Sequence, residues 1–291
     1  MVRTNKTQLM NLLAQKLAAS GKRLFSPSDV MEFFAQIRAE SNPPKSLTKD
    51  RFRALALETA ALTEVQLSAT YPLHTTRYCT GKFTEYELAL SLRPGSYLSH
   101  GTAAFLHGIT PNQPDFIYAN QEQSPKAQSG SLTQGGLNKA FSSKQRHSKF
   151  IVSYDQTNIM LLSGKHTNRL GVRQIVGAAN EAIEVTNLER TLIDIVVRPG
   201  YAGGTQNVLQ SFRYAHPKAS VGRLAEMLED LDYLYPYNQA IGFYLQRAGY
   251  DPESLESLRK RGQEYDFFLA HGMKNTKFDP QWRVHYPDEL S

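Results

Sequence analysis

The sequence contains a single cysteine, Cys79, and no long run of apolar residues. One cysteine forms no intrachain disulfide and no cysteine-based metal cluster, which is typical of a protein of a reducing compartment. No apolar stretch approaches the roughly 18 residues of a membrane-spanning helix. A leucine stripe near the amino terminus is interrupted by Gln15 and Lys16, so it lacks the continuous apolar core of a secretion signal. We therefore expect a cytoplasmic protein without a membrane partner.

The signatures of several enzyme classes are also missing. No Asp-x-Lys or Glu-x-Lys triplet of a restriction-type nuclease core occurs, and no G-x-S-x-G elbow of a serine hydrolase occurs. The segment 163–167 is similar to a phosphate-binding loop, but Ile159 stands where the first glycine of that motif belongs. His100 and His107 are seven residues apart without a third metal ligand, so both are expected to be structural. These absences predict a protein without catalysis, cofactor or metal.

The 291 residues suffice for two or three domains, and their net charge of +6 is distributed unevenly. Residues 1–80 contain 11 Lys and Arg against 6 Asp and Glu, and residues 125–175 contain 8 against 1. Residues 81–124 and 176–291 are acidic instead. The two basic blocks predict a polyanionic partner, the alternative being a basic surface that serves only solubility.

Residues 1–80 have the helix pattern of a winged-helix domain. The first helix has leucines at helical spacing and ends at Gly21. The second begins at Ser26, with Asp29 at the capping-box position, and the third begins at Thr48. The alternative is a three-helix module that serves protein contacts.

A hairpin is expected to follow the third helix and to form the wing. Alternating apolar residues predict a strand over 65–69, and a second strand is expected around 77–79. On the third helix, Arg51 and Arg53 flank an outward face that lacks base-reading side chains, so this helix is better suited to phosphates than to base edges. The candidate DNA-binding residues are Lys45, Lys49, Arg51, Arg53, His74, Thr75, Thr76 and Arg77.

Residues 81–291 are expected to form a mixed α/β domain, with an α+β part over 81–200 and a mainly helical part over 201–291. The expected helices cover 83–92, 99–108 and 132–141, with later ones starting near 217, 235 and 251, and the expected strands cover 116–119, 149–154, 158–162 and 172–176. A long polar loop is expected over 120–130. The predicted fold class is therefore α+β, with a winged helix-turn-helix at the amino terminus.

The segment 185–204 carries a complete set of helix signals. Thr186 and Glu189 have the capping-box spacing, and an Arg-Pro-Gly triplet ends the helix. Apolar residues on nearly every side predict that the helix is buried. Arg190 and Asp194 are four residues apart, which predicts an ion pair on the remaining edge.

Four stretches give the chain a likeness to a known family. They are YLSHGTAAFLHGIT at 97–110, ERTLIDIVVRPGYAGG at 189–204, NQAIGFYLQRAGY at 238–250 and FDPQWRVHYPDEL at 278–290. In this order, and over essentially the whole length, the chain resembles the AbiEi antitoxins of bacterial abortive-infection systems. The resemblance implies a winged helix that binds inverted repeats of double-stranded DNA in its own promoter and represses the operon. It also implies a carboxy-terminal domain that opposes a nucleotidyltransferase-like toxin in a type IV system, without a tight complex.

The basic block 125–175 is a candidate second surface, either for DNA or for opposing the toxin. Its residues are Lys144, Arg146, Lys149, Lys165, Arg169 and Arg173. The expected function is that of a DNA-binding antitoxin and autorepressor. One alternative is a stand-alone winged-helix transcriptional regulator without a toxin partner, and a more distant one is a divergent nuclease.

Overall fold

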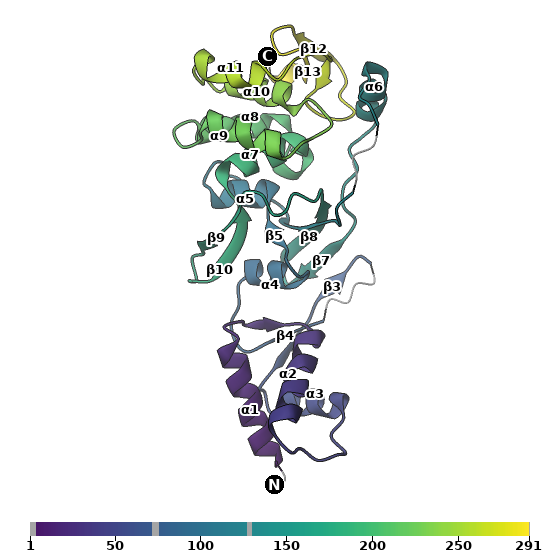
Figure 1. Cartoon of the computed structure of the whole chain (residues 1–291), viewed down its shortest axis with the longest axis vertical. Helices are drawn as coiled ribbons and strands as arrows, with labels where there is room; N and C mark the ends of the chain where they lie inside the picture. The colour runs from purple at the N-terminus through teal and green to yellow at the C-terminus, as the bar shows by residue number, and fades with distance from the viewer. Residues whose placement is uncertain (1–3, 72–75, 127–129, 291) are drawn as a thin grey trace.

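The computed structural model describes residues 4–71, 76–126 and 130–290, and it has the expected mixed α+β architecture. Figure 1 shows an elongated molecule with the amino-terminal helices at one end, a sheet in the middle and the carboxy-terminal helices at the other end. Over the described ranges, no helix is both long and apolar enough to cross a bilayer.

The amino-terminal module contains three helices and three short strands. The helices are α1 (Lys6–Ala19), α2 (Pro27–Glu40) and α3 (Lys49–Glu58), and the strands are β1 (Leu24–Phe25), β2 (Thr63–Val65) and β4 (Arg77–Cys79). These strands form an antiparallel sheet of order β1-β4-β2. The expected helix starts are confirmed, because Ser26 and Asp29 form a reciprocal capping box and the Thr48 side chain accepts a hydrogen bond from the Arg51 N–H.

The segment 65–69, expected as one strand of a hairpin, is divided between two sheets. β2 ends at Val65 and pairs with β4, whereas β3 (Ser68–Ala69) pairs with β7 (Ile151–Tyr154) of the central sheet. The Thr70 N–H continues this pairing by donating to the Ile151 carbonyl. Apolar alternation predicts an extended backbone but does not determine which strand completes its hydrogen bonds, so the prediction of one hairpin was wrong.

The central sheet has the strand order β3-β7-β8-β6-β5-β10-β9. Its other strands are β5 (Tyr97–Leu98), β6 (Ile117–Glu122), β8 (Thr157–Gly164), β9 (Val172–Val176) and β10 (Ala182–Thr186). β6 and β8 run parallel, as do β5 and β10, and the remaining neighbours are antiparallel. The helices α4 (Glu85–Ser91) and α5 (His100–Leu106) form where they were expected and contact this sheet.

Parts of this sheet were not expected from the sequence. β5 has two residues and β10 has a mixed apolar and polar composition, so neither produces a clear periodicity. β6 continues to Glu122, which shortens the expected loop over 120–130 at its start. Asn120 belongs to this strand because it pairs with Tyr97 of β5 and Leu162 of β8, and its buried side chain donates a hydrogen bond to the Tyr97 hydroxyl.

The carboxy-terminal part is not mainly helical to its end. Its helices are α8 (Thr205–Ala215), α9 (Val221–Asp230), α10 (Tyr237–Arg247) and α11 (Glu256–Arg259), with 3-10 turns η1 (Pro199–Ala202), η2 (Pro252–Leu255) and η3 (Asp288–Leu290). The helix α6 (Gln134–Ser142) lies beside them (Figure 1) and adds Leu137 and Phe141 to their core. A separate sheet of order β11-β13-β12 follows, formed by β11 (Phe267–Phe268), β12 (Thr276–Asp279) and β13 (Val284–Pro287).

Helix α7 (Leu188–Val197) lies between the central sheet and the carboxy-terminal helices, with α5 on one side and α8, α9 and α10 on the other. Its expected burial is confirmed, since Leu192, Ile193 and Ile195 have no exposed surface. The expected Arg190–Asp194 ion pair is also confirmed.

The predicted capping box of α7 was wrong. Asn187 caps the helix, and its side chain accepts a hydrogen bond from the Arg190 N–H at 2.9 Å. The Thr186 hydroxyl is buried against the Thr191 hydroxyl instead. The Glu189 carboxylate is taken by an ion pair with a residue of α9, because α9 packs against this end of the helix. Thr186 and Asn187 are adjacent and both residue types can cap a helix, so the tertiary partners of the side chains decide which of the two does so.

Candidate functional site

A cavity of about 1210 Å³ opens beside α7 at the carboxyl ends of the parallel strands β6 and β8. Asn120 of β6 and the Leu162–Gly164 end of β8 form one wall, and side chains of α7 and η1 form another. Concave sites beyond the carboxyl ends of parallel strands are common ligand sites in mixed sheets. The position of this cavity therefore makes it the first candidate for a binding site.

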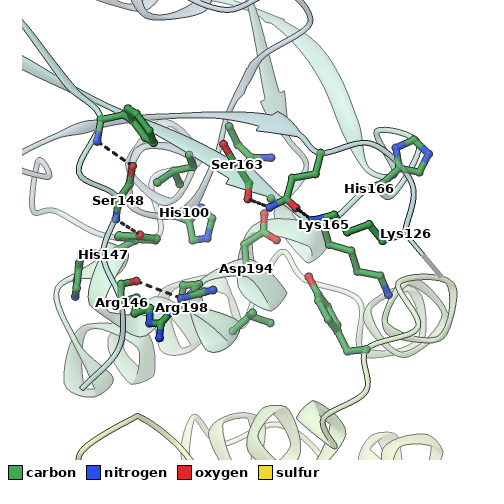
Figure 2. Close-up of a pocket in the computed structure, with 18 of the residues that line it drawn as sticks. His100, Lys126, Arg146, His147, Ser148, Ser163, Lys165, His166, Asp194 and Arg198 are labelled. Atoms are coloured by element: carbon green, nitrogen blue, oxygen red, sulfur yellow. Dashed lines mark hydrogen bonds between the residues drawn. The ribbon is translucent and has the colours of Figure 1, made fainter. Parts of the chain in front are cut away.

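The cavity walls are strongly basic. Their cationic side chains are Lys126, Arg146, Lys149, Lys165, Arg190 and Arg198, whereas the acidic side chain in the lining is Asp194. Arg190 forms an ion pair with Asp194. The other five cations form no ion pair with a carboxylate in the part of the chain that the structure describes. Figure 2 shows Arg146 and Arg198 on one side and Lys126 and Lys165 on the other. A concave surface with this charge excess attracts anions.

Lys165 is held in position by backbone carbonyls. Its ammonium donates to the Leu231 carbonyl at 2.8 Å and also to the Asp232 carbonyl. It lies 5.4 Å from the centre of the Tyr233 ring, close enough for a cation–π contact. A lysine ammonium has three N–H donors, so one remains for a ligand in the cavity.

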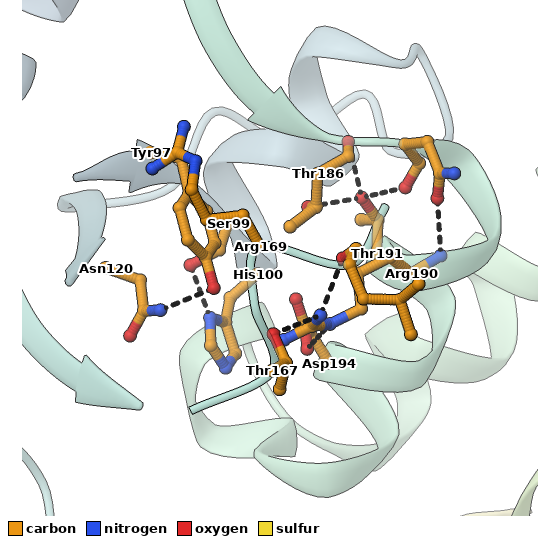
Figure 3. A network of polar contacts seen from close by, with 12 residues as sticks. Tyr97, Ser99, His100, Asn120, Thr167, Arg169, Thr186, Arg190, Thr191 and Asp194 are labelled. Atoms are coloured by element: carbon orange, nitrogen blue, oxygen red, sulfur yellow. Dashed lines mark hydrogen bonds and ion pairs between the residues drawn. The ribbon is translucent and has the colours of Figure 1, made fainter. Parts of the chain in front are cut away.

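The Arg190–Asp194 pair lines the cavity and is called here the floor of the site, and Figure 3 shows its polar contacts. Arg190 Nε donates to Asp194 Oδ1 at 2.8 Å, and both side chains are almost fully buried. Arg190 also donates to the Leu170 carbonyl at 2.8 Å and to the Thr167 hydroxyl at 3.2 Å. Burial is the largest influence and lowers the pKa of Arg190, but the Asp194 charge and hydrogen bond, together with Tyr233 and Tyr97, outweigh it and raise that pKa overall. The floor is therefore a fixed ion pair of no net charge.

Glu122, at the end of β6, ties the segment after β8 to the floor. Its carboxylate accepts hydrogen bonds from the Thr167 N–H at 2.9 Å, the Arg169 N–H at 3.1 Å and the Tyr97 hydroxyl at 3.1 Å, and from the Thr167 hydroxyl. Burial raises the pKa of Glu122, but these hydrogen bonds outweigh it and hold the pKa below its usual value. The carboxylate stays ionised and fixes the wall that carries Lys165.

His100 enters the cavity lining from the start of α5. It is 9% exposed and has a φ of 51°, a left-handed conformation that is costly for a residue with a Cβ. Its Nδ1 shares a hydrogen bond of 2.8 Å with the Ser99 hydroxyl, and its Nε2 has no hydrogen-bond partner among the described residues. Burial lowers the pKa of His100 to about 4, so the imidazole is neutral at pH 7.

The residue after His100 is a glycine because α5 and η1 approach closely. A Cβ at Gly101 would lie 2.6 Å from the Tyr201 carbonyl oxygen, which is closer than a real side chain allows. The Tyr201 ring packs edge-on against His100, with ring centroids 5.3 Å apart, and also against His147 at 5.2 Å. Its hydroxyl accepts a hydrogen bond from the Ser148 N–H. Tyr201 thus holds the strained histidine and one basic wall in place together.

An exposed aromatic pair lies at the rim of the cavity. Tyr71 and Phe150 are 41% and 40% exposed, and their ring centroids are 5.6 Å apart. The Arg93 guanidinium lies 5.4 Å from the centre of the Phe150 ring and also donates to the Leu162 carbonyl. The rim therefore combines flat apolar faces with an anchored cation.

The cavity contains half of the predicted second basic surface. Arg146, Lys149 and Lys165 line it, whereas Lys144, Arg169 and Arg173 do not. Arg169 is engaged elsewhere, because it forms a 2.8 Å ion pair with Glu184 and donates to the Gly95 carbonyl. Arg173 lines a smaller pocket near the start of α7, of about 420 Å³.

The predicted residues of the third helix lie on the surface of α3. Lys45 and Lys49 are exposed. Arg51 forms a 2.8 Å ion pair with Glu58, and Arg53 forms a 3.2 Å ion pair with Asp50, both between largely exposed side chains. Such exposed pairs contribute little and exchange readily for a phosphate partner.

Among the predicted wing residues, Arg77 is buried. Arg77 is 4% exposed, and its guanidinium donates to the Ser91 carbonyl at 2.7 and 3.0 Å, so its assignment to a DNA surface was wrong. It belongs to the packing between β4 and α4, and burial lowers the pKa of its guanidinium. Thr76 is half-buried beside it, and His74 and Thr75 lie outside the described residues.

Sequence reasoning missed most of the cavity. His100 was expected to be merely structural, and the Arg190–Asp194 pair was expected at a helix edge without a role in a site. Tyr71, Phe150 and Arg198 were not singled out. Among these three residues, only Phe150 has a signal in the sequence, because it follows Lys149 inside the basic block 125–175. Nothing in the sequence brings Tyr71 next to it.

No protein-family model and no curated protein matches this chain. Among solved structures, the chain is similar to the crystal structure of the RV2827C protein from Mycobacterium tuberculosis, with a TM-score of 0.55 and 16% sequence identity. The likeness covers 95% of this chain and 90% of that chain. It shows that the two proteins share a fold over nearly their whole length.

Proposed function

We propose that this protein is a DNA-binding autorepressor of AbiEi antitoxin type, whose amino-terminal module is a winged helix. The observation that carries the proposal is the topology of that module. Its order of α1, β1, α2, α3, β2 and β4, with a sheet of order β1-β4-β2, supports this proposal because a winged helix has the same order of helices and strands. In helix-turn-helix proteins the corresponding third helix enters the major groove.

The charge on α3 supports this use of the helix. Lys45 and Lys49 are exposed around its start, and Arg51 and Arg53 are bound only by surface ion pairs. DNA phosphates replace such carboxylate partners at small cost. Because the outward face lacks base-reading side chains, most of the affinity is expected to come from phosphate contacts.

The antitoxin role is proposed on the AbiEi-like stretches and on the basic cavity. Two of those stretches, 97–110 and 189–204, contain His100, Arg190, Asp194 and Arg198 of the cavity lining. The cavity is thus the proposed centre of the surface that opposes a nucleotidyltransferase-like toxin, by binding rather than by catalysis. The protein acts in the cytoplasm under this proposal, and its partners are its own promoter DNA and, without a tight complex, a nucleotidyltransferase-like toxin.

A mobility shift with the double-stranded DNA upstream of its own gene tests the DNA-binding part. The full chain should bind at modest salt, and the Lys49→Ala, Arg51→Ala double variant should bind more weakly and with a shallower salt slope. Lys260→Ala is the matched control, since Lys260 is an exposed lysine that directly follows α11, and α11 lies at the opposite end of the molecule from α3 (Figure 1). Equal affinity and slope in all three proteins would contradict the proposal.

Co-expression tests the antitoxin part separately. The full chain should relieve growth arrest by a nucleotidyltransferase encoded beside its gene. Operator binding without such relief would leave a stand-alone regulator.

A further inference from the structure

We propose that the basic cavity binds a nucleoside phosphate, with the phosphate between Arg146, Arg198 and Lys165 and the base against Tyr71 and Phe150. The cavity has the charge, the polar floor and the aromatic rim that this ligand class requires. The site would hold such a ligand whether or not α3 binds DNA.

The cations make the phosphate half of the site. Arg198 and Arg146 lie together, because Arg198 donates to the Arg146 carbonyl at 3.4 Å, and neither guanidinium has a carboxylate partner among the described residues. Lys165 is held by two carbonyls and keeps one N–H available. Two guanidinium groups and a positioned ammonium around a cavity match the several oxygens of a phosphate group. Without an anion these positive charges repel one another, so the arrangement favours an anionic ligand.

The floor supplies hydrogen bonding without further charge. Asp194 is neutralised by Arg190, so the acidic side chain of the lining does not repel a phosphate strongly. His100 Nε2 has no partner among the described residues, although its side chain is nine-tenths buried. In either tautomer the neutral ring presents one hydrogen-bonding nitrogen to the cavity. A polar atom that lines a cavity without a protein partner is expected to meet water or a ligand.

The aromatic rim makes the base half. Tyr71 and Phe150 line the cavity and are each about two-fifths exposed, where packing alone would bury them. The Arg93 guanidinium lies over the Phe150 ring and is itself held by a hydrogen bond to the Leu162 carbonyl of β8. Nucleobases stack on such rings without regard to sequence. Loss of one stacking partner corresponds to about a tenfold loss of affinity.

The size of the cavity separates this ligand class from a simple anion. Its volume of about 1210 Å³ is far larger than a phosphate ion needs and suits a nucleotide or the end of a strand. Two sources share this chemistry: a free nucleotide and the phosphorylated end of single-stranded nucleic acid. The experiment distinguishes them.

Calorimetric titration of the full chain with three probes tests the assignment. The probes are AMP, ribose 5-phosphate and a 5′-phosphorylated single-stranded tetranucleotide. AMP should bind about tenfold more tightly than ribose 5-phosphate, because only AMP carries a base. A tetranucleotide that binds more tightly than AMP would assign the site to a strand end, and equal affinity would assign it to free nucleotides.

Two variants test the base half and the phosphate half of the site separately. Phe150→Ala should weaken AMP binding, since only Tyr71 then remains for the base, and leave ribose 5-phosphate unchanged, whereas Arg198→Ala should weaken all three probes. Phe278→Ala is the matched control, because Phe278 is 42% exposed and does not line the cavity. Phe150→Leu serves as a second variant if the alanine variant does not fold.

Two results would overturn the proposal. One is the absence of binding of all three probes at millimolar concentration. The other is equal affinity for AMP and ribose 5-phosphate together with no effect of either Phe150 variant. Operator DNA takes no part in these titrations, so their failure is distinguishable from failure of the repressor proposal.

Discussion

The Tyr71 ring packs at a tilt of 51° against the Phe150 ring, with the ring centroids 5.6 Å apart. Tyr71 follows β3, which pairs with β7, and Phe150 immediately precedes β7. The same two rings line the mouth of the basic cavity. Residues 68–71 are therefore attached to the proposed ligand site by strand pairing and by ring contact.

Ligand binding should stabilise this attachment. A base stacked on Tyr71 and Phe150 holds the two rings together, so the adjacent hydrogen bond from the Thr70 N–H to the Ile151 carbonyl should open less often. Saturating AMP is expected to slow amide exchange at Thr70 by at least about fivefold. Hydrogen exchange measured by NMR checks this.

The Tyr71→Ala variant is the control for that measurement. It removes the ring that belongs to the amino-terminal module, so AMP should no longer change exchange at Thr70. An unchanged protection in this variant would show that Tyr71 does not transmit the effect.

The buried histidine makes stability depend on pH. The pKa of His100 is about 4 in the folded protein because of burial, below the usual 6.5. Between these values the unfolded state binds the proton and the folded state does not, so the free energy of unfolding falls as pH decreases from 6.5 to 4. The loss attributable to His100 is about 3 kcal/mol at most.

His100→Asn tests this contribution. Asparagine tolerates a positive φ better than other non-glycine residues and does not titrate, so the variant should keep the fold and lose part of the acid sensitivity. His107 and His271, whose pKa values burial also lowers, remain in the variant and retain their own share. Urea unfolding at pH 7 and pH 4.5 measures the difference, and an unchanged pH slope would assign the sensitivity to other groups.

The Arg190–Asp194 pair should be costly to break from one side. Asp194→Asn leaves the Arg190 charge buried without its carboxylate, and such changes cost about 3–5 kcal/mol. The matched control is Glu58→Gln, which removes one partner of the exposed Arg51–Glu58 pair and should cost less than about 1 kcal/mol. Urea unfolding of both variants gives the comparison, and similar losses would contradict the importance of burial.

Local signals in the sequence predict local structure well in this chain. Ser26 and Asp29 satisfy backbone groups only three residues away, so their spacing alone predicts the helix start that the structure has. At α7 the same reasoning assigned the cap to Thr186 and was wrong, because the partner of Glu189 is Arg223, 34 residues further along the chain. Spacing contains no information about such a partner.

The cavity, too, could not be predicted from sequence spacing. Lys149 and Lys165 come from one basic block and were predicted as a surface, but Arg198, His100 and Tyr71 reach the same cavity from distant segments. Their convergence depends on how β3 and α7 pack on the central sheet, which is set by tertiary contacts. The left-handed backbone of His100 likewise follows from packing against Tyr201 and has no pattern in the sequence.

The packing of Trp282 on α10 gives a further prediction. The fully buried Trp282 ring lies so close to Gly242 that a Cβ there would be 2.1 Å from a ring atom. Gly242→Ala forces the ring or the helix to move, and overpacking of this kind costs about 1–3 kcal/mol despite the better helix propensity of alanine.

Gly222→Ala is the matched control, because Gly222 lies in α9 with its nearest neighbour 3.9 Å from the added Cβ. That variant should be neutral or more stable by about 0.5–1 kcal/mol. Thermal unfolding should therefore move in opposite directions in the two variants, and a stabilised Gly242→Ala protein would mean that Trp282 has room to shift.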